Sequence, residues 1–582
     1  SWPFTAPRGS MAAILLKSHD APQDWLTRFM DAKLGGFFNW FNRVFKRSSE
    51  NYSGRVERIL GHKKRAFVIY LLLIGLTALG FYKVPMGYIP PQDKQYLIGF
   101  AQLPDGSSLN RTEKVVSQMS DIALKNQGVE HSVAFPGLSI YGFTSSPSAG
   151  VVFLPLKSFD QRTSKDLSAA SIAQSVNMQF GMIKDAFMLV LPPPPVRGLG
   201  TSGGFKLQLE DRTDMGDEAL SAAKDAVLGK AYQSPILDPH QTYSGYQINV
   251  PQLAVDLDRT KAKQLGVPIT DIFSTMQIYL GSLYVNDFNK FGRTYQVIAQ
   301  ADSPFRAHPE DIAKLKVPNL AGEMVPLGSV LTVNQGYGPE RAMRYNSYRT
   351  ADISSAPAKG YSTGQAQAEM EKILNETLPK GMGYEWTELS YQQILAGNAA
   401  LLVFPLCVLL VFLVLAAQYE SLILPLAVIL IVPMCMLCAI GGVWLVGGEN
   451  NIFTQIGLMV LVGLACKNAI LIVEFARELE LNGSTPFEAA VEATKMRLRP
   501  ILMTSFAFIM GVLPLVFASG AGAEMRYAMG IAVFSGMLGV TFFGLYLTPV
   551  FYVGLRNMAG TKLHSAHESA IHSHAPVRRP KV

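Results

Sequence analysis

The chain has 582 residues, of which 49% are hydrophobic and only 16% are charged. Its length exceeds that of one ordinary domain, and its mean hydropathy of +0.20 is typical of a membrane protein with a large water-exposed part and not of a soluble enzyme. The net charge of +7 comes from basic residues that cluster beside the hydrophobic segments, which favours basic cytoplasmic flanks over nucleic-acid binding.

Catalytic chemistry is not indicated. No nucleophile–base, metal or phosphate-loop motif appears, so enzyme activity is the least expected function. The cysteines all lie in apolar segments and imply no disulfide framework for the polar region. They are Cys407, Cys435, Cys438 and Cys466.

The N-terminal region leads into a first apolar segment. Residues 1–10 lack the pattern of a signal peptide, and residues 1–21 are expected to be a truncated or non-family start. Residues 22–65 mix aromatic and basic side chains, which predicts an amphipathic helix on the cytoplasmic membrane face, with an ordinary soluble helix as the alternative. A first transmembrane helix is expected at 66–84. The basic residues before this helix place its N-terminal side in the cytoplasm, so the chain that follows the helix emerges on the outer side of the membrane.

A polar block of several hundred residues follows, about 84–395, without a further membrane-length apolar run. Short alternating strands and helical stretches predict an α+β arrangement of small strand–helix–strand units. Prolines 192–195 and the glycines after them mark a probable boundary between two units. Further breaks are expected near 243–247 and 335–339.

Five more apolar spans close the chain, giving six expected crossings and a cytoplasmic C-terminus. A basic loop over 477–499 should lie inside, and the base-free loop 519–524 outside. The tail contains four histidines, and a flexible cytoplasmic tail is a better interpretation than a metal site. The five spans are expected at about 398–418, 422–446, 452–475, 501–519 and 527–555.

Lys467 lies near the middle of the apolar segment 457–475. A charge there costs at least ~2.5–3.5 kcal/mol, and snorkelling to the interface is the simpler alternative. Glu474 is about 10.5 Å away along the helix, too far for a direct pair. Either the lysine is deprotonated or its carboxylate partner comes from another polypeptide, and we favour the partner because buried ions are generally paired. A lysine–carboxylate pair that titrates would form a proton relay.

Arg497 and Thr504 are the polar candidates in the next span. They are seven residues apart and therefore lie roughly on one helix face, on either side of Pro500. We expect Pro500 in the first turn of that helix, where proline is tolerated.

Motifs around these residues resemble the resistance–nodulation–division (RND) multidrug efflux pumps of the AcrB type. The matching stretches are GLACKNAILIVEFAREL, MRLRPILMTSFAFIMGVLPL, TPVFYV, VPMGYIPPQDK, GSLYVNDFNKFGR and YEWTELSYQQ. The resemblance covers nearly everything from about residue 12 to 555. A further stretch is similar to the MexF/OqxB-like subgroup, FPGLSIYGFTSSPSAGVVF.

The resemblance implies that this chain matches only the C-terminal half of such a pump. Lys467, Arg497 and Thr504 would be the second-half members of a proton relay, with protons as the coupling ion and no cofactor. Lys467 would pair with paired transmembrane aspartates of the absent N-terminal half. Further implied partners are two more copies in a homotrimer, a periplasmic adaptor (membrane fusion) protein, an outer-membrane channel and small amphiphilic drugs. The implied location is the inner membrane of a Gram-negative bacterium.

The resemblance also implies a fold: a bundle of six transmembrane helices plus α+β periplasmic porter subdomains, built from ferredoxin-like βαβ units, and a docking subdomain. One porter subdomain would span 92–197, and a second would combine 200–245 with 338–390. The docking subdomain would be 246–337, with an extended loop at 285–293 that reaches a neighbouring subunit. Helices would occupy 396–557, and the tail 558–582.

A glycine-rich segment, 136–150, is similar to the family's switch loop between two drug pockets. For each aromatic candidate nearby, ordinary core packing is the alternative to a drug contact. The implied switch-loop residues are Pro136, Gly137, Gly142 and Gly150. The implied substrate-binding residues are Phe135, Tyr141, Phe143, Phe153 and Phe205.

Two other functions remain open. A metal-exporting RND relative would call for additional ionisable residues in the spans and methionine ligands in the porter cleft, whereas Met178, Met182 and Met188 resemble packing residues. An inactive fragment that acts only as a structural or assembly module would be consistent with the missing aspartates.

Overall fold

The computed structural model describes residues 25–141, 143–200, 203–397 and 399–559. The chain forms two compact units. Of the described residues, the first unit comprises 25–84, 399–518 and 526–559, and the second comprises those within 85–397 together with 519–525. The predictions for residues 1–21, for Gly142 and for most of the tail lie outside the described residues.

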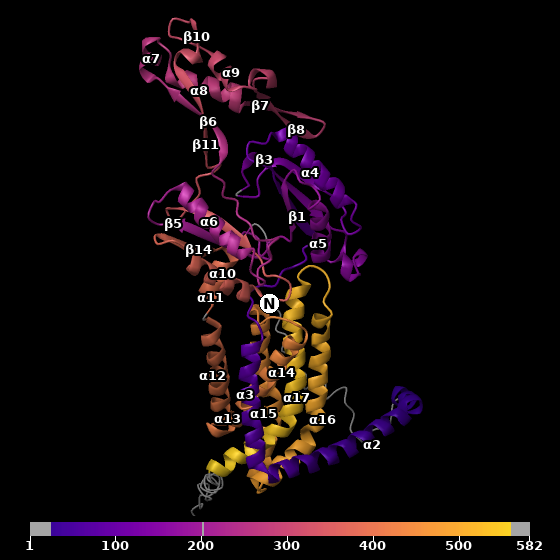
Figure 1. Cartoon of the computed structure of the whole chain (residues 1–582). Helices are drawn as coiled ribbons and strands as arrows, with labels where there is room; N and C mark the ends of the chain where they lie inside the picture. Colours follow the sequence, from indigo (N-terminus) through magenta and orange to yellow (C-terminus); the bar gives the residue numbers. More distant parts are fainter. Residues whose placement is uncertain (1–24, 142, 201–202, 398, 560–582) are drawn as a thin grey trace, which may run out of the picture. The chain divides into compact units, whose positions relative to one another are not determined.

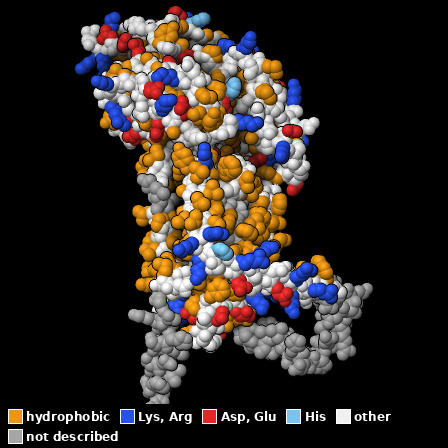
Figure 2. Space-filling view, turned by 60° about the horizontal axis from the view of Figure 1, so that its bottom comes forward, with side chains coloured by type: hydrophobic (Ala, Val, Ile, Leu, Met, Phe, Trp, Pro, Cys, Tyr) orange, Lys and Arg blue, Asp and Glu red, His pale blue; other side chains and the backbone are white. Residues whose placement is uncertain are grey.

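The first unit is helical, because its segments are long apolar runs with few charges. Six helical segments of the described part are long and apolar enough to cross a membrane. Figure 2 shows hydrophobic side chains covering the bundle surface, with lysines and arginines gathered at one end. Its helices are α2 (Trp25–Gly61), α3 (Lys63–Lys83), α12 (Ala399–Tyr419), α13 (Ile423–Ile429), α14 (Val432–Leu445), α15 (Ile452–Leu481), α16 (Pro486–Val516) and α17 (Ala523–Ala559), whose first residues belong to the second unit.

Helix α16 corrects two predictions. It begins after Thr485, whose side chain forms a capping box with Glu488, and this satisfies the free amide groups of the first turn. Pro500 therefore lies inside the helix and not in its first turn. The expected loop over 477–499 is also wrong, since α15 ends at Leu481 and only 482–485 separate the two helices.

The second unit contains two four-stranded antiparallel sheets. In the first, the strand order is β2-β3-β1-β4. Alternate side chains of its strands point to opposite faces of the sheet. Leu97 and Val152 pack in a core with the helices, whereas Ile98 and Val151 belong to a second hydrophobic cluster. The elements are β1 (Tyr96–Gln102), α4 (Leu109–Leu124), β2 (Val133–Leu138), β3 (Ser145–Pro155), α5 (Ala169–Phe180) and β4 (Phe187–Leu191).

The second sheet has the order β12-β13-β5-β14. Leu207 and Leu209 on β5 and Ala351 and Ile353 on β13 share a core with two helices. The elements are β5 (Phe205–Asp211), α6 (Asp217–Ala231), β12 (Arg344–Tyr345), β13 (Tyr348–Ser355), α10 (Thr363–Thr377), β14 (Met382–Thr387) and α11 (Glu388–Ala396).

A third part lies between α6 and β12 in the sequence (Figure 1). Two strands, β6 (Val250–Leu257) and β11 (Leu331–Gly338), pair along their full length, and a small separate core lies beside them. The hairpin of β7 (Leu283–Lys290) and β8 (Arg293–Ala299) is exposed at every residue. The remaining elements are α7 (Arg259–Gln264), α8 (Ile269–Met276), α9 (Pro309–Lys314), β9 (Lys316–Pro318) and β10 (Met324–Pro326).

Candidate functional site

Helices α15 and α16 pack against each other and carry all three predicted relay residues (Figure 1). Their short connection makes them antiparallel neighbours, so residues late in α15 face residues early in α16. Three side-chain contacts join the two helices along this interface. We call the residues that make them the cation cluster: Lys467, Asn468, Phe475, Arg497, Ser505 and Phe508.

Lys467 is half-buried on α15, and its ammonium lies 4.4 Å from the ring centroid of Phe508 on α16. A cation over an aromatic face is attracted by the ring quadrupole, by about 0.5–2 kcal/mol depending on desolvation. Among the described residues, no carboxylate lies within ion-pair distance of Lys467. The cation–π contact with Phe508 is thus the interaction that positions the ammonium, and the ammonium can still pair with an anion.

Arg497 lies nearer the start of α16 and, like Lys467, contacts an aromatic ring of the other helix. Its guanidinium carbon lies 3.6 Å from the centroid of Phe475, and its buried Nε has no hydrogen-bond partner among the described residues. Thr504, two turns further along, donates its hydroxyl to the carbonyl oxygen of Ile501 at 3.1 Å. The structure therefore places the three predicted residues on one helix pair but gives them no direct contact with one another.

A buried hydrogen bond lies between these two cations. The Nδ2 of Asn468 donates to the Oγ of Ser505 over 3.0 Å, and both residues are fully enclosed. Each follows a predicted relay residue directly in the sequence. This bond joins α15 to α16 beside Lys467, because an amide in an apolar environment needs a partner.

The aromatic residues predicted to bind substrate do not form one cluster in the sheet-rich unit. Phe135 on β2 and Phe153 on β3 form an edge-to-face pair with centroids 5.9 Å apart. Phe205 is buried in the core of the other sheet, 5.6 Å from Trp386. Tyr141 packs near Phe100, and Phe143 is 54% exposed.

The predicted switch-loop segment is mostly a β-hairpin. Pro136 on β2 pairs with Gly150 on β3, and the register shifts between Pro136 and Leu138. Gly137 at this bulge has φ +82°, which favours glycine. Gly150 is required by packing instead, because a Cβ there would lie 2.3 Å from the side chain of Val116 on α4. The connecting loop itself is confined to 139–144.

The sequence of this chain matches one transporter family across almost its whole length. Residues 8–556 match the model of the AcrB/AcrD/AcrF family. The chain belongs to the AcrB/AcrD/AcrF family. The multidrug/solvent efflux pump membrane transporter MepB of Pseudomonas putida is 42% identical over 532 residues, which are 91% of this chain and 50% of MepB. The multidrug export protein AcrF of Escherichia coli K12 is 39% identical over 525 residues, 90% of this chain and 50% of AcrF.

The AcrB/AcrD/AcrF membership confirms the resemblance at the level of the family, and with it a helical membrane part and a sheet-rich part. The chain spans about half the length of these curated relatives. Sequence reasoning missed Phe508, Phe475, Asn468 and Ser505. The one available signal was the amide of Asn468 inside an apolar helix, since the aromatic partners depend on how the helices pack.

Proposed function

We propose that this chain forms the C-terminal half of a proton-driven RND multidrug transporter in the inner membrane of a Gram-negative bacterium. The observation that carries the proposal is the cation cluster, in which Lys467 lies within an apolar helix without a carboxylate in reach among the described residues. A partly buried cation with no carboxylate partner among the described residues favours an anion supplied from elsewhere. Paired aspartates of an N-terminal half are the partner that we propose.

In this mechanism the lysine alternates between pairing and release. When the aspartates are ionised, the Lys467 ammonium pairs with them; when they take up protons from the outer side, the attraction falls and the ammonium moves. Arg497 and Thr504 respond to the altered charge, and α15 and α16 shift relative to each other. The protons leave on the cytoplasmic side, and the cycle restarts.

The substrates that we propose are small amphiphilic drugs. Phe135 is 43% exposed and forms an edge-to-face pair with the partly buried Phe153. The pair provides apolar area with few fixed polar groups, which suits ligands of varied shape. The proposed assembly is a homotrimer that acts with a periplasmic adaptor protein and an outer-membrane channel. Relatives named as multidrug and solvent efflux pumps support this direction of transport.

Co-expression tests the proposal directly. This chain is produced in a Gram-negative strain without its own pumps of the family, alone and together with a separately encoded N-terminal half that carries the paired aspartates. We expect ethidium to be expelled only when both halves are present. If both halves assemble in the membrane and no drug is expelled, the chain is a structural or assembly module instead.

A further inference from the structure

A buried ion pair joins the last turn of α15 to the end of α17. Glu480 is the last residue but one of α15, and Tyr552 and Arg556 lie in the last three turns of α17. All three belong to the helical unit. They are 72 and 76 positions apart in the sequence, so the pair forms only when the two helices pack together.

Glu480 accepts hydrogen bonds from both side chains of α17. The hydroxyl of Tyr552 donates to Oε2 at 2.6 Å. The Nε of Arg556 lies 3.1 Å from each carboxylate oxygen, and its Nη2 donates to Oε1. Tyr552 and Arg556 are four residues apart and therefore lie on the same face of their helix. The carboxylate is thus held by two neighbouring side chains of one helix.

This network is almost completely buried. The side chains of Glu480 and Arg556 are 11% and 8% exposed, and Tyr552 is 1% exposed. Hydrogen bonds between ionised groups are stronger than neutral ones, and surroundings without water strengthen them further. If one partner were lost, the other would become an unpaired buried charge. The ion pair therefore fixes the two helix ends against each other.

Small residues bring α15 and α17 close together at a second place. A Cβ at Gly536 on α17 would lie 2.3 Å from the side chain of Leu461 on α15, and a Cβ at Gly457 on α15 would lie 3.2 Å from the Cβ of Ala532 on α17. Small residues allow the backbones of membrane helices to approach closely. Helix α17 therefore holds α15 both in its first half and at its end.

Two of these contacts lie on the side of α15 that faces away from Lys467. At about 100° per residue, Glu480 is about 140° around the helix from Lys467 and about 20 Å further along it. Leu461 is about 120° around the helix from Lys467 in the opposite sense. The ammonium of Lys467 instead contacts Phe508 on α16. A turn of α15 about its axis would thus break its contacts with α17 and carry the ammonium sideways.

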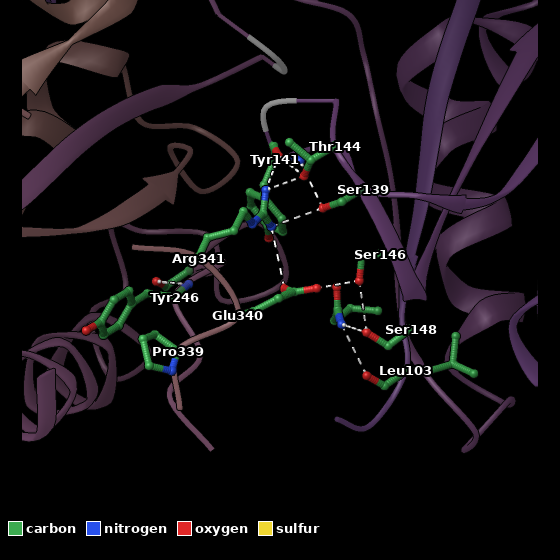
Figure 3. A network of polar contacts seen from close by, with 12 residues as sticks. Leu103, Ser139, Tyr141, Thr144, Ser146, Ser148, Tyr246, Pro339, Glu340 and Arg341 are labelled. Atoms are coloured by element: carbon green, nitrogen blue, oxygen red, sulfur yellow. Dashed lines mark hydrogen bonds and ion pairs between the residues drawn. The ribbon is translucent and has the colours of Figure 1, made fainter. Parts of the chain in front are cut away.

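The sheet-rich unit contains a comparable network around Arg341 (Figure 3). Its guanidinium group donates to the hydroxyl groups of Ser139 and Thr144, at 3.2 and 3.0 Å, and to the carbonyl oxygen of Tyr141. The guanidinium carbon lies 5.6 Å from the centroid of the Tyr141 ring, and the carboxylate of Glu340 lies 3.7 Å from Nη2. Here too an arginine with several directed bonds joins distant segments. The Glu480 network differs because it lies on a helix that carries a predicted relay residue.

We propose that Glu480 and Arg556 are positioning residues for Lys467. Their ion pair holds α15 against α17 and so sets the rotation of α15 from which the ammonium meets its anionic partner. This role rests on the proposed function, because the partner belongs to the proton relay. The ion pair stays intact while the ammonium pairs and releases, and α15 and α17 move together. Without the ion pair, the end of α15 can turn, and the ammonium occupies a wider range of positions.

The distance between two spin labels tests the ion pair without transport. In the full chain, the four native cysteines are replaced by alanine, and Leu481→Cys and Met558→Cys place labels at exposed positions beside the pair. We expect Glu480→Ala to broaden the distance distribution at least twofold. Glu478→Ala is the matched control, since this side chain is exposed and makes no described contact. Equal widths for the parent and Glu480→Ala would overturn the proposal.

A second variant covers the case in which Glu480→Ala does not fold. Glu480→Leu with Arg556→Met removes both charges together, and the replacement of a buried ion pair by apolar residues is often neutral for stability. The same broadening is expected. A distribution as narrow as that of the parent would also overturn the proposal.

The pH profile of efflux by the assembled transporter tests the effect on Lys467. A nearby ammonium favours the ionised form of its carboxylate partner, so the partner takes up its proton at a higher pH when the ammonium is displaced. With Glu480→Leu and Arg556→Met, we expect the pH of half-maximal efflux to rise by about one unit. Arg556→Lys keeps the charge and should leave this pH near that of the parent.

A purely structural role predicts a different outcome. Reduced efflux with an unchanged pH profile would overturn the positioning of Lys467. If the parent exports nothing, the proposed function fails, while the label distances still decide whether the ion pair holds α15 to α17.

Discussion

Both regions of interest place a cation over an aromatic ring, but they fix it very differently. Arg341 in the sheet-rich unit donates hydrogen bonds to three residues of one loop and has a carboxylate beside it. Lys467 in the helical unit contacts one ring, and no described carboxylate is within reach. Several directed hydrogen bonds stabilise one geometry, whereas a cation with a single weak contact can change partners at low cost. The first arrangement suits a positioning residue and the second suits a switch.

Removal of the lysine should have the largest effect. In the assembled transporter, we expect Lys467→Ala to abolish drug efflux while trimer assembly persists, because no other described cation occupies the middle of α15. Dye efflux measures transport, and the size of the purified complex measures trimer assembly. Lys495→Ala is the control, since this lysine is half exposed and only 4.0 Å from Glu492 on its own helix. Normal efflux by Lys467→Ala would exclude the relay assignment.

Loss of the ring beneath the lysine should weaken transport without abolishing it. Phe508→Leu removes a cation–π contact worth about 0.5–2 kcal/mol, so we expect efflux to fall by up to about thirtyfold. Phe506→Leu is the matched control on the same helix, because Phe506 is 60% exposed and has no described contact with a cation. Equal efflux by both variants would mean that the ring does not position Lys467.

In the sheet-rich unit, Gly245→Ala should disturb the packing of Tyr141. The new methyl group would lie 2.6 Å from the ring, and such overpacking costs about 1–3 kcal/mol. The unfolding midpoint should therefore fall. Gly229→Ala is the control, since a Cβ there meets nothing within 4 Å. An unchanged midpoint would show that the loop accommodates the methyl group.

The smallest effect concerns the hydrogen bond that joins α15 to α16. In a double-mutant cycle of Asn468→Ala and Ser505→Ala, we expect a coupling of about 0.6 kcal/mol, as for other hydrogen bonds between membrane helices. Unfolding of the four purified proteins in detergent measures it. Strict additivity of the two single effects would show that the bond contributes nothing to the helix pair.

Some of this organisation could be predicted from the sequence, and the reasons differ between residues. Lys467 is conspicuous because a charge in an apolar run is costly, and the family follows from continuous motifs. The prediction for Pro500 is wrong because the capping box of Thr485 and Glu488 starts α16 well before this proline. Phe508 and Arg341 could not be found, because their roles depend on neighbours far away in the sequence. Helix packing and sheet contacts decide those neighbours, and local patterns do not encode them.

We propose that Lys467 is half of a charge-exchanging pair that another chain segment completes. Substrate-coupled proton flux tests it most directly, in proteoliposomes that hold both halves under an imposed pH gradient. We expect drug addition to increase the flux for the parent and not for Lys467→Ala, and we expect no drug-dependent flux from this chain alone. Drug-dependent flux in the lysine variant, or in this chain alone, would contradict it.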